Sequence, residues 1–211
     1  MEITDIQVQK RNRNRVSIHV DGKYRFSLDF VSFSHSGLHV GDSLSEEQIE
    51  LITRKDEFFR ARDYAFSLLS YRERTEHEIK SRLFEKGFSA GTVRSVLDLL
   101  RERALIDDRS FAKRWIEDAL SARPMGKLRV AHELKKKRVD ERIIEDVCAN
   151  SFEPGTESEL ARRAAKKKLG TMESYPREVA KRRLFAFLKN RGFDFEIIQD
   201  LMKEYFSDHL E

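Results

Sequence analysis

The feature that most constrains the fold of this chain is a short segment that occurs three times after residue 60. The copies span residues 83–88, 134–139 and 188–193, and their first residues are 51 and 54 positions apart. Each copy ends one amphipathic helical pattern and is followed by another. A repeat at a nearly fixed period predicts tandem structural units in which neighbours share a core.

A further helical pattern precedes each of these pairs, so the repeating unit has three helices. The first of the three carries Ala65, Leu68 and Leu69, then Phe111, Trp115 and Ile116, then Leu160 and Ala164; the last carries Val93, Val96, Leu97 and Leu100, then Ile143, Ile144 and Val147, then Ile197, Ile198 and Leu201. The sequence therefore predicts a mainly α fold, an elongated and curved array of three three-helix repeats at 58–106, 107–155 and 156–211. A Glu-Pro-Gly linker is expected at 153–155.

Local signals agree with these helix boundaries. Thr75 and Glu78 have the spacing of a capping box, and Gly87 and Gly192 stand where a left-handed residue closes a helix. The second repeat has Arg138 at that position, and a left-handed residue other than glycine costs about 1 kcal/mol. Either the helix continues through Arg138 or the turn differs.

The first 57 residues form a separate N-terminal extension. Apolar residues alternate at Val16, Ile18 and Val20 and again after Asp21-Gly22, which is typical of a β-hairpin with a type I′ turn. A capping box that begins at Ser45 then predicts a helix carrying Ile49 and Ile52. The exposed hairpin cations could contact phosphate or could protect an edge strand from aggregation; they are Arg11, Arg13, Arg15, Lys23 and Arg25.

Charge is unevenly distributed along the chain. The net charge is +4, but residues 123–191 carry +9 and residues 192–211 carry −5. A basic segment within a nearly neutral protein is typical of a surface that binds a phosphate backbone or an acidic protein. The alternative is a solvated helix face.

Three clusters of cations make up the candidate binding surface. Four consecutive cations follow Leu134, more than a helix C-terminus needs for its dipole. Like charges recur four residues apart at 162–168, a destabilising arrangement that favours a polyanionic partner. The third cluster lies at 181–191, where Arg stems could instead cover apolar surface. The candidates for filament or DNA binding are Lys127, Arg129, Lys135, Lys136, Lys137, Arg138, Arg162, Arg163, Lys166, Lys167, Lys168, Lys181, Arg182, Arg183, Lys189 and Arg191.

Aromatic residues gather near the C-terminus, and two interpretations are open. Exposed rings can stack on bases of a single strand, whereas helical spacing with neighbouring Leu and Ile favours core packing. We expect core packing for these rings and for Trp115. The C-terminal rings are Phe185, Phe187, Phe193, Phe195 and Phe206.

Enzymatic chemistry is not expected. The six His residues, His209 among them, have no paired metal-ligand spacing, and no phosphate-binding glycine loop occurs. The single cysteine, Cys148, lies in an apolar stretch and is expected to be buried rather than nucleophilic. We therefore expect no cofactor and no metal. With no apolar run long enough to span a membrane, a cytoplasmic monomer that does not contact membranes is expected.

One set of residues at the repeat junctions matches the pattern of a known family. These residues are Arg62, Asp63, Tyr64, Ala65, Leu69, Arg72, Thr75, Glu78, Leu83, Gly87, Phe88, Leu105, Ile106, Asp107, Asp108, Phe111, Ala112, Gly126, Lys127, Glu133, Leu134, Lys135, Lys181, Leu184, Leu188, Arg191, Gly192 and Phe193. With them, the repeat junctions resemble those of the RecX family, regulators of the bacterial RecA recombinase. The likeness covers residues 58–206, and the β-rich start is similar to the extension of longer members. Arg138 departs from the glycine that the family usually has there.

This resemblance implies a helical protein that binds the recombinase filament and has no catalytic residues. Binding would inhibit ATP hydrolysis, strand exchange and co-protease activity toward the SOS repressor, either by blocking filament ends or by coating the groove. The implied partners are a RecA-type filament and the single- or double-stranded DNA within it. Two alternatives stay open: a free-standing module that binds bare DNA, and a helical scaffold whose charges only keep it soluble.

Overall fold

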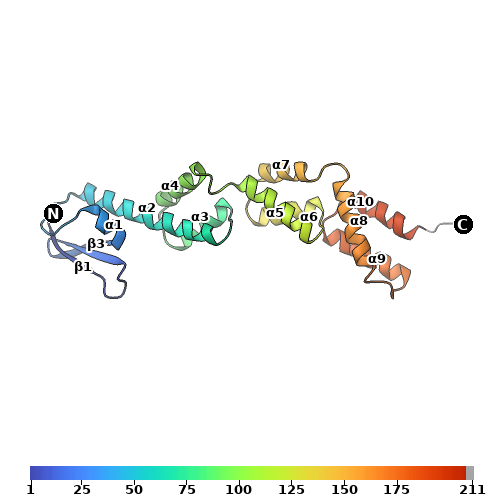
Figure 1. Cartoon of the computed structure of the whole chain (residues 1–211), viewed down its shortest axis with the longest axis horizontal. Helices are drawn as coiled ribbons and strands as arrows, with labels where there is room; N and C mark the ends of the chain where they lie inside the picture. The colour runs from blue at the N-terminus through green and yellow to red at the C-terminus, as the bar shows by residue number, and fades with distance from the viewer. Residues whose placement is uncertain (208–211) are drawn as a thin grey trace. The chain divides into compact units, whose positions relative to one another are not determined.

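The computed structural model describes residues 1–207, and the elements fall into two compact units, Met1–Ile106 and the chain from Asp107 onward. The first unit contains β1 (Ile3–Val8), β2 (Arg15–Val20), β3 (Lys23–Asp29), α1 (Phe30–Ser36), α2 (Glu46–Tyr71), α3 (Glu76–Glu85) and α4 (Ala90–Glu102) (Figure 1). The second contains α5 (Asp108–Ala122), α6 (Lys127–Lys136), α7 (Glu141–Ser151), α8 (Thr156–Leu169), α9 (Arg177–Asn190) and α10 (Phe195–Phe206). The last four residues of the predicted third repeat, His209 among them, lie outside the described residues.

The N-terminal strands form an antiparallel sheet in the order β1-β2-β3. Asp21 and Gly22 both have positive φ, of 50° and 74°, as a type I′ turn requires, so the predicted hairpin is confirmed. Burial alternates along β2, where Val16, Ile18 and Val20 face the core and the intervening residues do not. This alternation places one face of the sheet on α1 and on the start of α2.

Helix α2 is shared by two cores. The capping box at Ser45 is confirmed, with Ser45 and Gln48 hydrogen bonded to each other's backbone. Ile49 packs against the sheet, whereas Ala61 and Ala65 are fully buried against α3 and α4. The sequence predicts separate patterns on either side of residue 57, and the structure joins them in one helix of 26 residues.

Three three-helix domains follow the pattern predicted from the repeats. They consist of the second half of α2 with α3 and α4, then α5–α7, then α8–α10, and each has its own buried cluster. Within residues 1–207, no helix is long and apolar enough to cross a membrane.

The turn between the second and third helix is the same in all three domains. Gly87, Arg138 and Gly192 each adopt a left-handed conformation, with φ of 83°, 58° and 72°. In each turn, the following residue donates its backbone N–H to the carbonyl five residues earlier, as from Val139 to Leu134 at 3.3 Å. This is the hydrogen bond of a Schellman motif. Arg138 therefore does not extend the helix; it makes the same turn as glycine, in a conformation that is unfavourable for its side chain.

Candidate interaction surface

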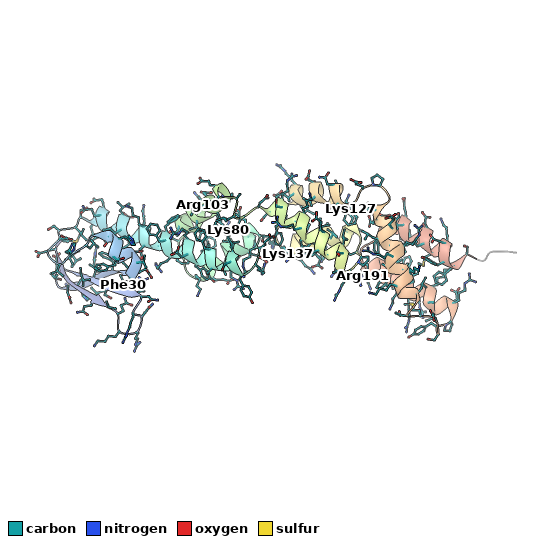
Figure 2. The ribbon with its side chains drawn as sticks, in the orientation of Figure 1. Phe30, Lys80, Arg103, Lys127, Lys137 and Arg191 are labelled. Atoms are coloured by element: carbon teal, nitrogen blue, oxygen red, sulfur yellow. The ribbon has the colours of Figure 1, made fainter. Side chains whose placement is uncertain are left out.

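A cation precedes the left-handed residue in every domain, and it lies over an aromatic ring. The C-cap residues Lys86 and Lys137 place Nζ 5.3 Å from the centroid of Tyr64 and 5.7 Å from that of Phe111. Both rings belong to the first helix of the same domain. Lys137 is one of the predicted binding residues (Figure 2). Its ammonium group makes this cation–π contact inside the domain.

Arg191 is the equivalent cation of the third domain and makes a different set of contacts. Its guanidinium lies 5.1 Å from the centroid of the Phe187 ring. Lys168 Nζ lies 5.6 Å from the same centroid. Arg191 Nη1 donates to the carbonyl of Pro124 at 3.2 Å, in the loop that follows the second domain's first helix. Arg191 thus joins the third domain to the second.

Two glycines allow the backbones of these domains to touch. Gly126 donates its N–H to the carbonyl of Arg191 at 2.9 Å. A Cβ on Gly126 would lie 2.1 Å from the carbonyl oxygen of Gly192, and a Cβ on Gly192 would lie 2.4 Å from the nitrogen of Arg129. Neither position can hold a side chain without moving the backbone opposite.

Polar contacts from α8 reinforce the same junction. Glu157 Oε1 accepts the backbone N–H of Lys127 at 3.1 Å and that of Asp194 at 3.3 Å. Arg163 Nη2 donates to the carbonyl of Leu120 at 2.8 Å. The second and third domains are therefore held together by contacts beyond the chain connection at the predicted linker, 153–155.

Several other predicted binding residues are paired within the second unit. Glu133 accepts from Arg129 at 2.7 Å and from Lys136 at 3.4 Å, both on α6. Lys135 pairs with Glu141, and Arg162 pairs with Glu204 at 3.0 Å. The repulsion expected at 162–168 is thus relieved at Arg162 by an acidic residue from α10.

A second group of predicted residues remains open to solvent, and we call these side chains the open cations. They are exposed and make no ion pair, hydrogen bond or ring contact with the described part of the chain. The open cations are Lys127, Arg138, Lys166, Lys167, Lys181, Arg182 and Lys189. The remaining candidate, Arg183, is exposed but lies 4.2 Å from the ring centroid of Tyr175.

An aromatic pair accompanies the open cations on α9. The rings of Phe185 and Phe195 meet edge to face at a centroid distance of 6.3 Å. Residues four apart share a helix face, so Lys181, Phe185 and Lys189 form one row along α9. Phe195 is 58% exposed, so its predicted core position is wrong.

Alignment of the three repeats could have predicted that Phe195 is exposed, although its apolar neighbours favour a core position. Phe195 directly follows the N-cap Asp194, and the equivalent residues Ala90 and Glu141 are exposed at the start of α4 and α7. Phe193 differs, because it follows the left-handed turn and is buried in the third core. Phe185, Phe187, Phe206 and Trp115 are half-buried against their cores.

The single cysteine is buried, and the described histidines take part in no group that could hold a metal ion. Cys148 is 1% exposed, and burial raises the pKa of its thiol, which keeps it protonated near neutral pH. Among residues 1–207, no group of three His, Cys, Asp or Glu side chains could hold a metal ion.

Comparison with family models identifies four matching stretches. The description "Regulatory protein RecX N-terminal domain" matches residues 1–45, and the first, second and third three-helix domains of RecX match residues 61–100, 107–147 and 156–202. Regulatory protein RecX of Clostridium perfringens (strain 13 / Type A) is 30% identical over 204 residues, which cover 96% of this chain and 95% of that protein. Regulatory protein RecX of Clostridium botulinum (strain Eklund 17B / Type B) is 29% identical over 205 residues, with the same coverage.

Solved structures give the same result for the fold. The crystal structure of a regulatory protein RecX has a TM-score of 0.69 at 28% identity, covering 94% of this chain and 98% of the other. RecX from Lactobacillus salivarius has a TM-score of 0.65 at 21% identity over 71% of this chain and 97% of its own, a likeness of fold.

Proposed function

Because the chain belongs to the RecX family of regulatory proteins, we propose that it binds filaments of a RecA-type recombinase and inhibits their ATPase, strand-exchange and co-protease activities. The protein would act by binding, without chemistry of its own. The partner surface would be the acidic face of the filament or the DNA within it.

The observation that carries this proposal is the set of open cations, which lie on α6, in the turn that follows it, and on α8 and α9. Cations that serve only the fold are paired here, as Arg162 is with Glu204 and Arg129 with Glu133. Lys166, Lys167 and Lys189 have no such contact with residues 1–207. Unpaired positive charge on neighbouring helices favours a polyanionic partner.

A second candidate function is direct binding of bare DNA, favoured by the ring pair of Phe185 and Phe195. The exposed ring is that of Phe195, and it meets Phe185, which lies between Lys181 and Lys189 on one face of α9. The Phe195 ring could stack on an unpaired base while these ammonium groups contact phosphates. On this alternative, the protein would compete with a recombinase for DNA rather than act on the assembled filament.

The first experiment titrates the full chain into a RecA-type ATPase reaction on single-stranded DNA and measures binding to the same DNA alone. We expect ATP hydrolysis to fall at concentrations too low to cover the bare DNA. Inhibition only at concentrations that saturate the bare DNA would favour the second candidate. Normal hydrolysis at every concentration would contradict both.

A further inference from the structure

The loop between β1 and β2 carries an isolated group of positive charges in the first unit. Residues 9–15 contain four cations and no acidic residue, although residues 1–60 as a whole are slightly acidic. Lys10, Arg11 and Arg13 are exposed and make no side-chain contact with the described residues. This loop plays no part in the function proposed for the second unit.

The backbone of the loop is held by its own hydrogen bonds. Arg15 donates its N–H to the carbonyl of Asn12 at 3.0 Å, and Asn14 donates to Asn12 Oδ1 at 3.1 Å. Gln9 closes the loop by donating its N–H to the carbonyl of Arg15 at 2.9 Å. The three cations therefore project from an ordered turn, which reduces the entropy lost when they bind a ligand.

Two neighbouring cations of the hairpin, Arg15 and Arg25, contact the fold instead. Arg15 Nη2 donates to the carbonyl of Ser27 at 3.0 Å, and Arg25 pairs with Glu46 at the start of α2. Strand β1 is an edge strand of the sheet, but Lys10, Arg11 and Arg13 follow its last residue, Val8. They therefore place no charge along the unpaired edge itself, as residues that protect an edge strand would.

An exposed aromatic residue is hydrogen bonded to this loop through its backbone. Phe30 donates its N–H to the carbonyl of Asn14 at 2.8 Å, which places the start of α1 against the loop (Figure 2). Phe30 is 49% exposed. The nearby carboxylate of Asp29 is engaged, since it accepts the N–H of Val31 at 3.0 Å as the N-cap of α1.

We propose that single-stranded nucleic acid binds to the loop between β1 and β2 together with the start of α1. We call this site the loop surface, and it consists of Lys10, Arg11, Arg13 and Phe30. The ring would stack on an unpaired base, and the three cations would contact the flanking phosphates. An acidic protein would use the cations but would not need the adjacent exposed ring. Base pairs of a duplex are already stacked on each other, so the ring favours a single strand.

The charge part of the proposal is tested with the full chain and a fluorescein-labelled oligothymidylate of about 15 nucleotides, within the usual range of single-strand sites. Anisotropy titrations at several salt concentrations compare the wild type with Lys10→Glu/Arg11→Glu/Arg13→Glu. The matched control is Lys80→Glu/Arg94→Glu/Arg103→Glu, which reverses three exposed cations, one on α3, one on α4 and one directly after α4. We expect the slope of log K against log salt to become smaller in magnitude by about 2 in the triple variant of the loop surface, because each of the three lost phosphate contacts contributes about 0.7. A slope equal to that of the control would overturn the proposal.

The ring is tested with Phe30→Ala, with Val31→Ala as its control because Val31 is the next residue and is 62% exposed. We expect Phe30→Ala to weaken oligothymidylate binding about 5- to 150-fold, the range measured for loss of one stacked base. Binding of an abasic oligomer of equal length should not change. If Phe30→Ala weakened binding to the oligothymidylate and to the abasic oligomer equally, stacking would be contradicted. If it weakened binding to polyglutamate as much as binding to the oligothymidylate, the partner would be an acidic protein instead. Circular dichroism melting curves verify that each variant is folded.

Discussion

At the scale of single residues, Arg138 carries a conformational cost that its equivalents avoid. Its φ of 58° lies in the left-handed region, where Gly87 and Gly192 stand in the other domains. Arg138→Gly should therefore stabilise the second unit by about 1 kcal/mol. Thermal denaturation would show a higher melting temperature. Arg138→Ala removes the same charge but keeps the strain, so a gain in that variant would assign the effect to charge instead.

The two glycines at the junction of the second and third domains allow a sharper residue-scale test. A methyl group on Gly126 would lie 2.1 Å from the carbonyl oxygen of Gly192, so Gly126→Ala must push the backbones apart. We expect a loss of about 1–3 kcal/mol in the free energy of unfolding, measured with urea. Gly91→Ala is the control, because Gly91 lies within α4 with no atom in 4 Å of its would-be Cβ. That change should stabilise the protein by up to about 1 kcal/mol, and a similar gain at Gly126 would contradict the packing described here.

At the scale of elements, Glu57 joins α2 to the start of α4. Its carboxylate accepts the N–H of Ser89 at 2.8 Å and the hydroxyl of Thr92 at 2.6 Å. Burial raises the pKa of Glu57, but the hydrogen bonds from Thr92 and Ser89 and the charge of Arg60 together lower the pKa below its ordinary 4.5. A lowered pKa means that the folded state binds the proton less tightly than the unfolded state.

This sign predicts how the contribution of Glu57 varies with pH. It should be fully present above pH 4.5 and lost as the pH falls through the lower pKa of the folded state. The stability difference between wild type and Glu57→Gln, measured by urea unfolding at pH 7 and at about pH 3, should therefore shrink in acid. Glu50→Gln, an exposed position on the same helix, controls for general acid effects. An undiminished difference at low pH would show that Glu57 acts through packing.

At the scale of the whole molecule, substitution of the open cations should weaken binding to a partner without changing the stability of the fold. Lys166→Glu/Lys181→Glu/Lys189→Glu changes three exposed side chains that have no contact within residues 1–207, so the melting temperature should stay near that of the wild type. If these side chains contact a filament or its DNA, half-inhibition of the RecA-type ATPase should need about tenfold more of the variant protein. This corresponds to a loss of about 1.4 kcal/mol in the free energy of binding. Lys80→Glu/Arg94→Glu/Arg103→Glu matches the charge change in the first unit. Equal inhibition by both variants would remove the open cations from the interaction.

Much of the fold follows from short-range patterns in the sequence. The hairpin at Asp21-Gly22, the cap at Ser45 and the left-handed turns at Gly87 and Gly192 depend on residues within about one helical turn of each other. Apolar periodicity also predicts the three cores, because a helix must bury its apolar face. The turn at Arg138 is an exception. The sequence predicts a longer helix or a different turn there, because a left-handed residue other than glycine is unfavourable, whereas the structure has the same turn as at Gly87 and Gly192.

Only the tertiary structure decided which charges and rings are available to a partner. Arg162 and Glu204 are 42 residues apart, and Arg191 meets the carbonyl of Pro124 across 67 residues. Phe185 and Phe195 lie on different helices, and their rings meet at a centroid distance of 6.3 Å. The amino-acid sequence by itself determined the helices, turns and domains because these arise from local hydrogen bonding and periodic burial. The pairing of charges and rings arises from contacts between distant segments, which no local pattern encodes.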